Sequence, residues 1–176
     1  MTSSDRFAVA TILGDLRRKV GNGEFGYRSQ SFFAHLILRI GGTVQEIRPQ
    51  GHPDIVATIE GATTFVEVEV ASLFSRKHVL KSDDLVALTG LHPDQRGYLA
   101  ILDISPPISW LLVESQVLRF RKPSSLNLAT IRALSNRGLS MRCTEEFIRM
   151  INNHRDSLYN LTFALLTSRA LSGTSL

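Results

Sequence analysis

The stretch that decides the expected fold consists of two short segments, GHPDIV at residues 51–56 and TFVEVEV at residues 64–70. Both contain β-branched residues, which are typical of strands, yet both carry acids within apolar runs. Because successive side chains of a strand point to opposite faces, Glu67 and Glu69 share one face and the valines of residues 66–70 share the other. The residues expected to be buried on that valine face are Ile55, Ala57, Val66, Val68 and Val70.

A hairpin is predicted between the two segments, because Glu60-Gly61 lies between them and favours a turn. A two-residue loop would pair Asp54 with Glu67, and a four-residue loop would pair Asp54 with Glu69. Directly opposed residues have Cβ atoms about 4.5 to 5.5 Å apart. Either loop therefore keeps all three acids on one face.

Three carboxylates held that close repel one another unless a cation compensates their charge. A hard divalent metal is the simplest compensation, since Mg²⁺ takes oxygen ligands, commonly one or two carboxylates together with waters and substrate phosphate. A metal in such a site activates water and stabilises a departing oxygen, which points to phosphodiester hydrolysis. The alternative is that these acids line an exposed face of the sheet.

Hydrophobic periodicity and turn residues predict the elements around this hairpin. The expected helices begin near residue 4 and end at residue 20, cover residues 30–40 and 75–88, and recur from residue 126 onward, with a loop at residues 21–26. The other expected strands cover residues 43–48, 98–104 and 110–113. We expect a single α/β domain over residues 1–176, in which helices flank a central mixed sheet and the C-terminal part is helical.

The acids and the order of the elements resemble the PD-(D/E)XK, or restriction-endonuclease-like, nuclease superfamily. Its pattern is a helix, a strand, Pro-Asp at the start of the next strand, a strand with an acid-X-Lys signature, and a helix. The resemblance implies a nuclease-like core over about residues 26–122 and a helical C-terminal extension over residues 123–176. It makes Asp54 the central metal ligand and Glu67 the second, and it offers the carbonyl oxygen of Val68 as a further ligand.

The chain departs from that pattern at position 69, where the superfamily usually has a catalytic lysine and this chain has Glu69. Some members use an acid-X-acid version, in which the final Glu helps to bind metal or orients the attacking water, and others take a lysine from the following helix. Lys77 and Lys81 lie four residues apart on one face of that helix, so either is a candidate catalytic residue, with plain solvent exposure as the alternative. For the acid that the superfamily carries on its first core helix, the second helix offers Gln30 and His35, and Glu24 lies just upstream in the expected loop.

Positive charge is concentrated towards the C-terminus. Residues 115–176 hold 9 Lys and Arg against 3 Asp and Glu, whereas residues 1–114 hold 11 against 13. Phosphate neutralisation supplies most of the sequence-independent affinity of proteins for nucleic acid. We therefore expect a nucleic-acid partner, DNA in the first place, contacted by Arg119, Arg121 and Lys122, with solvated helix faces as the alternative account of the charge.

The composition argues against several other classes. Cys143 is the single cysteine, so the chain cannot build an internal disulfide or a cysteine-rich zinc site. No apolar run approaches the roughly 20 residues that span a bilayer, and the N-terminus lacks an apolar signal core, so we expect a cytoplasmic protein without membrane contact. Gly-rich phosphate loops, nucleophile elbows and His-Glu-X-X-His helices are absent from the sequence.

The function expected from these observations is that of a Mg²⁺-dependent DNA endonuclease that hydrolyses phosphodiester bonds, with Mn²⁺ as a substitute metal. Asp54, Glu67, Glu69 and the Val68 carbonyl are the expected metal ligands. The resemblance also implies a homodimer. The alternative is a catalytically inactive nuclease-like module that binds nucleic acid or a protein partner, and Glu69 in place of lysine favours it.

Overall fold

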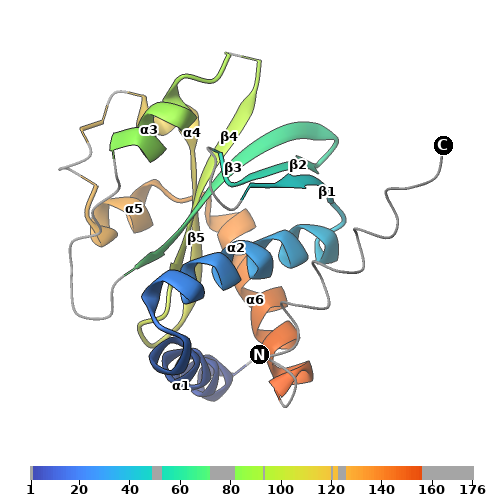
Figure 1. The fold of residues 1–176 in the computed structure, drawn as a ribbon, viewed down its shortest axis with the longest axis vertical. Coiled ribbons are helices and arrows are strands. Elements are labelled where there is room, and N and C mark those ends of the chain that lie inside the picture. Colours follow the sequence, from blue (N-terminus) through green and yellow to red (C-terminus); the bar gives the residue numbers. More distant parts are fainter. Residues whose placement is uncertain are drawn as a thin grey trace.

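The computed structural model describes residues 2–48, 53–71, 82–92, 94–119, 121–122 and 126–155 (Figure 1). These residues form an α/β fold around a five-stranded mixed sheet. The strands, in hydrogen-bonded order, are β1 (Thr43–Ile47), β2 (Ile55–Ile59), β3 (Ala62–Ala71), β4 (Arg96–Asp103) and β5 (Ser109–Glu114). The helices are α1 (Ser3–Val20), α2 (Asn22–Arg39), α3 (Ser82–Thr89), α4 (Ser115–Leu118), α5 (Leu128–Leu134) and α6 (Arg137–Asn153).

Strands β3 and β4 are parallel, and the other neighbouring pairs of the sheet are antiparallel. A parallel pair needs a crossover connection, and α3 lies in the segment that joins β3 to β4. The expected central mixed sheet flanked by helices is thus confirmed.

The β2–β3 hairpin has the two-residue loop that the sequence predicts. Glu60 has φ 52° and Gly61 has φ 79°, and two left-handed central residues are typical of the type I′ turns that match the twist of paired strands. Ile59 pairs with Ala62 and Ile55 pairs with Val66, which excludes the four-residue alternative.

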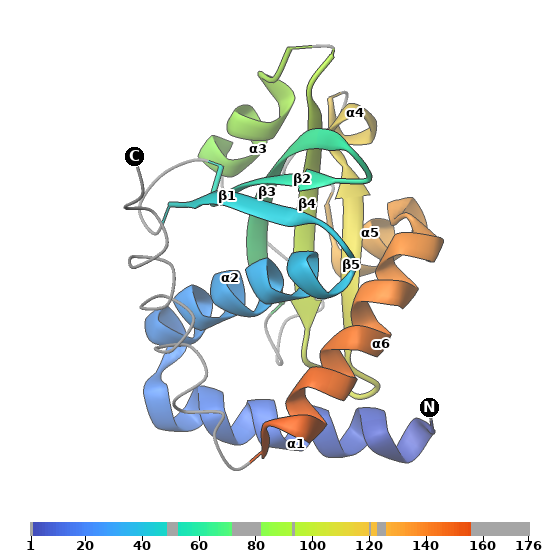
Figure 2. The same cartoon turned by 90° about the vertical axis from the view of Figure 1, so that its right-hand side faces the viewer.

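Helices cover both faces of the sheet, and each face has its own hydrophobic core (Figures 1 and 2). On one face, α1, α2 and α6 bury an aromatic group in which the ring of Trp110 lies 4.9 Å from that of Phe33 and 5.6 Å from that of Phe147. On the other face, α3, α4 and α5 pack on the outward side chains of β3, β4 and β5, including Ala71 and Leu99. We call these the α2/α6 face and the α3/α5 face.

The predicted valine face is confirmed and belongs to the α2/α6 face. Ile55, Ala57, Val66 and Val68 are buried there, and Val70 is partly buried against the same core. By alternation, Glu67 and Glu69 lie on the α3/α5 face together with Ala71.

The predicted loop at residues 21–26 is wrong, because α2 begins at Asn22. The chain breaks only at Gly21, whose φ is 85°, and the helix resumes with Glu24 paired to Arg28 one turn later. Phe25 is 1% exposed, so its burial offsets the low helix propensity of the neighbouring glycines. Propensity is a weak prior, and packing overrides it here.

The remaining predicted elements agree with the structure where it describes them. The first helix is confirmed and starts with a Thr2/Asp5 capping box. The third expected helix is confirmed over α3, and its first part lies outside the described residues. The helical C-terminal part is confirmed by α5 and α6, and α6 packs against β5 in the main core. None of the described helices is long and apolar enough to cross a membrane.

Candidate functional site

Asp54 directly precedes β2 and is only 6% exposed. Its Oδ1 atom accepts a hydrogen bond from Gln30 Nε2 at 2.8 Å, and its Oδ2 atom accepts one from the main-chain N–H of Val68, also at 2.8 Å. Helix α2 supplies the first donor and strand β3 the second. The carboxylate is therefore held in one orientation at the junction of a helix and two strands.

Gln30 reaches Asp54 from the first helix that packs on the sheet, and it is one of the two residues that the sequence offers on this helix in place of an acid. An ionised carboxylate only accepts hydrogen bonds, so the amide nitrogen of Gln30 must face it. The contact is neutral and brings no additional negative charge towards Asp54.

Glu67 lies in the middle of β3 and is 3% exposed. The register that pairs Ile55 with Val66 places Asp54 opposite Glu67 when it is continued by one residue beyond β2. On the parallel side Glu67 pairs with the buried Leu99 of β4. The structure thus brings two buried acids to adjacent strands, as the two-residue hairpin predicts.

Val68 contributes backbone groups to the same place. The N–H and C=O of one strand residue point to the same side of the strand. The N–H of Val68 donates to Asp54, so the carbonyl of Val68 also points to the side of β3 where Asp54 precedes β2. The residues that carry oxygen donors in this part of the sheet are Asp54, Glu67 and, through its carbonyl, Val68.

This donor set fits a hard divalent cation. Mg²⁺ prefers oxygen ligands and is commonly held by one or two carboxylates with waters completing its shell. A carboxylate has about four lone-pair sites, so one of its oxygens can accept a hydrogen bond and bind a cation at the same time. Within the described ranges, no three His, Cys, Asp or Glu side chains are grouped closely enough to hold one ion. Glu69, half-buried, follows two residues further along the same face.

The predicted cations fall into two groups. Lys77 and Lys81 lie outside the described residues. Arg119, Arg121 and Lys122 follow α4 and are exposed, and Arg119 Nη2 donates to the carbonyl of Leu91 at 2.9 Å. Helix α4 packs on the α3/α5 face through its buried residue 118, so this segment lies on the same side of the sheet as the β3 acids.

Sequence reasoning missed an ion pair on that same face, in which the acid is buried and the Arg132 side chain is 49% exposed. Asp103, at the end of β4, is 0% exposed; its Oδ1 atom accepts from Ser105 N at 3.0 Å and its Oδ2 atom pairs with the guanidinium of Arg132 from α5. The neighbouring Ala71 of β3 is directly beside Asp103 in the register. The expected strand 98–104 includes Asp103, but its partner Arg132 lies 29 residues further along the chain, so no local pattern of the sequence indicates this pair.

Cys143 is fully buried in α6, and burial raises the pKa of its thiol to about 12. The thiolate is the reactive form of cysteine, so this side chain is an inert part of the core at neutral pH. A buried thiol with a raised pKa is a poor nucleophile, so we assign Cys143 no catalytic role.

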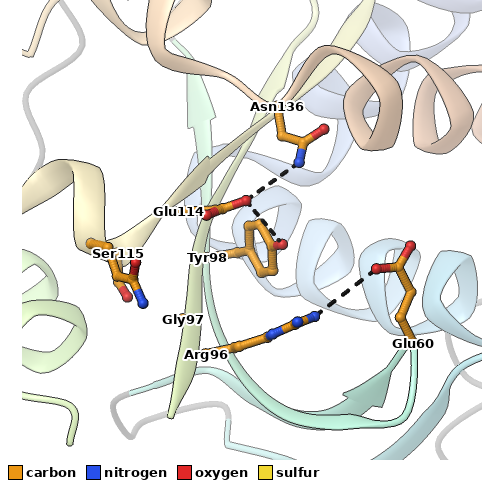
Figure 3. Close-up of a pocket in the computed structure, with 8 residues that line it drawn as sticks. Glu60, Arg96, Gly97, Tyr98, Glu114, Ser115 and Asn136 are labelled. Atoms are coloured by element: carbon orange, nitrogen blue, oxygen red, sulfur yellow. Dashed lines mark hydrogen bonds and ion pairs between the residues drawn. The ribbon is translucent and has the colours of Figure 1, made fainter. Parts of the chain in front are cut away.

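A second polar region, also missed from the sequence, lies where β3 and β4 begin. A pocket of about 360 Å³ opens there, and several charged and polar side chains face it (Figure 3). Its lining residues are Glu60, Arg96, Gly97, Tyr98, Glu114, Ser115, Gln116 and Asn136. They come from the hairpin turn, β4, β5, α4 and the start of α6, which are far apart in the sequence.

No family model matches the chain, and no curated protein or solved structure is significantly similar to it.

Proposed function

We propose that this chain is a metal-dependent DNA endonuclease of the PD-(D/E)XK type, in its acid-X-acid version. The observation that carries the proposal is the fixed carboxylate of Asp54, held by Gln30 and Val68 opposite the buried Glu67. The order α2, β1, β2, β3, α3 supports the proposal, because it is the order of elements in the superfamily pattern.

In this proposal Asp54, Glu67 and the Val68 carbonyl hold Mg²⁺, and Mn²⁺ substitutes for it. When bound, the ion supplies a Lewis acid that lowers the pKa of water and stabilises charge on a phosphodiester. Gln30 orients Asp54 through its amide. Glu69, next on the same face, orients the attacking water or accepts its proton.

The counter-charge usually supplied by a lysine at position 69 comes from elsewhere in this proposal. Lys77 and Lys81, in the segment after β3, remain the candidates for it. Their role is electrostatic, since a cation near the attacked phosphate stabilises the charge that develops in the transition state.

The proposed substrate is DNA, because exposed cations lie on the same side of the sheet as the β3 acids. Arg119, Arg121 and Lys122 are exposed after α4. Contacts to phosphates release condensed counterions, so affinity should fall steeply as salt is added. Neutralising the three residues together should weaken binding and flatten that salt dependence.

The test of catalysis compares wild-type protein with Asp54→Asn and Glu67→Gln, which each remove a ligating charge at nearly constant shape. Both should abolish Mg²⁺- or Mn²⁺-dependent cleavage of supercoiled, linear, branched and single-stranded DNA while the far-ultraviolet circular dichroism is retained. The matched control is Asp94→Asn, because the Asp94 side chain is 90% exposed. Wild-type protein that binds metal and DNA yet cuts none of these substrates would exclude the enzyme.

A second candidate function is a nuclease-like module that binds nucleic acid or a protein partner without cleavage. It is favoured by two features of the site: Glu69 stands where the superfamily has lysine, and helix α2 presents the neutral Gln30 to Asp54. The same assay distinguishes the two, because this module retains DNA binding in the absence of any cleavage.

A further inference from the structure

The pocket at the start of β3 and β4 has its charged side chains on the α2/α6 face, opposite Glu67, while Gly97, Ser115 and Gln116 complete its wall from the α3/α5 side. Tyr98 of β4 packs in the hydrophobic core of the α2/α6 face. It pairs with Glu114 of the neighbouring strand β5. Alternation along β4 places Arg96 on this same face. The pocket is therefore separate from the acids of the proposed nuclease site, and its ligand does not depend on that function.

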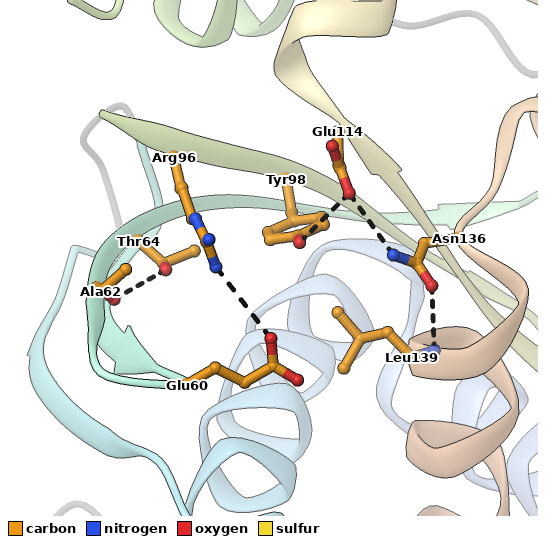
Figure 4. Close-up of polar contacts among 8 residues, drawn as sticks. All are labelled: Glu60, Ala62, Thr64, Arg96, Tyr98, Glu114, Asn136 and Leu139. Carbon is orange, nitrogen blue, oxygen red and sulfur yellow. Dashed lines mark hydrogen bonds and ion pairs between the residues drawn. The ribbon is translucent and has the colours of Figure 1, made fainter. Parts of the chain in front are cut away.

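Glu114 is the half-buried carboxylate of this pocket, and the donors that contact it within the described residues are neutral. Tyr98 Oη donates to Glu114 Oε1 at 3.5 Å, and Asn136 Nδ2 donates to the same oxygen at 3.4 Å (Figure 4). Both distances are at the long end for hydrogen bonds. Among the residues with described positions, no Lys, Arg or His lies within ion-pair distance of Glu114.

Two features of the surroundings favour a negative charge and hydrogen-bond donors at this place. Asn136 is the N-cap of α6, a 17-residue helix whose N-terminal dipole favours a negative charge nearby. Burial and the charge of Glu114 raise the pKa of Tyr98, so its phenol stays protonated at neutral pH and continues to donate. An anionic ligand would meet repulsion from this carboxylate, whereas a cation would find acceptor capacity on it.

The opposite wall of the pocket also carries a carboxylate, Glu60 in the hairpin turn. Arg96 Nη1 lies 4.0 Å from Glu60 Oε2, and their side chains are 53% and 64% exposed. Exposed pairs of this kind contribute little to stability and are easily exchanged. Exchanging Arg96 for another cation at Glu60 therefore costs little free energy.

The shape of the pocket depends on Gly97. A Cβ atom at this position would lie 2.5 Å from Leu91 Cδ1 and 2.9 Å from Ser115 Cβ. The missing side chain lets the start of α4 pack directly on β4, which places Ser115 in the wall of the pocket.

We infer that this pocket binds a small organic cation, a protonated amine or a guanidinium, with Glu114 as its anchoring carboxylate. A charged N–H donor forms a shorter and stronger hydrogen bond to a carboxylate than the neutral donors that now contact it. Glu60 provides a second negative charge across the pocket, and Arg96 competes with the ligand for it.

The test titrates ¹⁵N-labelled protein with ethylguanidinium, butylammonium and, as an anion of similar size, butyrate. The backbone amide resonances of Gly97 and Ser115 report on the pocket. Both cations should cause saturable shifts, and butyrate should not. Glu114→Gln should lower the affinity for both cations about tenfold, because it removes roughly one charge-assisted hydrogen bond. The side-chain carbonyl of the new glutamine can still accept hydrogen bonds from Tyr98 and Asn136.

Arg96→Gln is the variant that best distinguishes cation from anion binding, because it removes the cation that competes for Glu60. It should raise the affinity for both cationic probes severalfold. An anionic ligand would instead bind this variant more weakly. Glu46→Gln, on the distant strand β1, should leave the affinity unchanged. The inference is overturned if neither cation gives saturable shifts, if Glu114→Gln binds them as the wild type does, if Arg96→Gln weakens them, or if butyrate binds more tightly.

Discussion

The two carboxylate regions of the sheet differ in what holds them. Asp54 is 6% exposed, and both of its oxygens are fixed at 2.8 Å, one of them by a main-chain N–H of the sheet itself. Glu114 is half-buried, and its donors are two side chains at 3.4 and 3.5 Å. A main-chain donor cannot leave without unfolding the strand, whereas side chains can rotate. The Asp54 carboxylate is thus fixed in one orientation, whereas the Glu114 carboxylate and its donors can rearrange.

The ion pairs of the two faces repeat this contrast. Asp103 is fully buried and pairs with Arg132, whereas Glu60 and Arg96 are both exposed and 4.0 Å apart. Buried charges are costly unless they are paired, and exposed ones are stabilised by water. The contrast therefore predicts very different responses to the same kind of substitution.

The largest effect is expected at Arg132. Arg132→Gln leaves the Asp103 carboxylate buried with the Ser105 N–H as its described donor, and should cost about 2 to 3 kcal/mol of unfolding free energy. Arg96→Gln removes an exposed pair and should cost less than about 1 kcal/mol. Urea unfolding of both variants measures the difference. Equal losses would show that the two pairs are held alike and would remove the contrast.

The next effect concerns Gln30. Gln30→Glu replaces the amide donor by a second carboxylate facing Asp54, so without metal it should lower the unfolding free energy by about 1 to 3 kcal/mol. Mg²⁺ should restore part of that loss, because a ligand that binds only the folded state stabilises it. Thermal unfolding with and without Mg²⁺ measures both effects.

The matched control for Gln30 is Gln116→Glu in the exposed lining of the pocket, which should change stability by less than about 0.5 kcal/mol. If Mg²⁺ stabilises Gln30→Glu no more than the wild type, the acids of this region do not share an ion.

The sequence allowed the hairpin and the pairing of its acids to be predicted because both depend on local rules. Glu60-Gly61 sets a two-residue turn, the turn sets the register, and alternation along the strands then assigns each face. The buried valines and the position of Asp54 opposite Glu67 follow from these steps.

The regions that sequence reasoning missed depend on tertiary packing. Arg132 contacts Asp103, and Asn136 contacts Glu114, because helices that follow these acids by more than 20 residues pack on the sheet. The early start of α2 was missed for the same reason, since the burial of Phe25 outweighs the local preference of its glycines. No local pattern contains this information.

A smaller effect is expected at the turn that connects the two regions. Gly61 has φ 79°, and a Cβ added to it would meet no atom within 4 Å, so Gly61→Ala adds backbone strain alone and should cost about 1 to 2 kcal/mol. Chemical denaturation measures this cost. Gly23→Ala is the control, because Gly23 lies in helix α2 with a negative φ and equal space, and alanine should stabilise it. A neutral Gly61→Ala would indicate that the turn does not need its left-handed residue.

The smallest effect is the titration of Tyr98, which reports the charge in the pocket directly. Burial raises the pKa of its phenol above the usual 10.0, and the negative charge of Glu114 adds to the rise while Arg96 opposes it. Glu114→Gln should therefore lower the pKa of Tyr98, and Arg96→Gln should raise it; Tyr98→Phe identifies the signal. Ultraviolet difference absorption of the phenolate measures all three variants.

The raised pKa also predicts how Tyr98 affects stability at high pH. The pKa of Tyr98 is higher in the folded than in the unfolded protein, so its contribution to folding stability is fully present below about pH 10. That contribution is lost as the pH rises through the folded pKa. If the two charge variants shift the pKa in the same direction, Glu114 and Arg96 do not act on Tyr98 through their charges, and the pocket lacks the electrostatic character assigned to it.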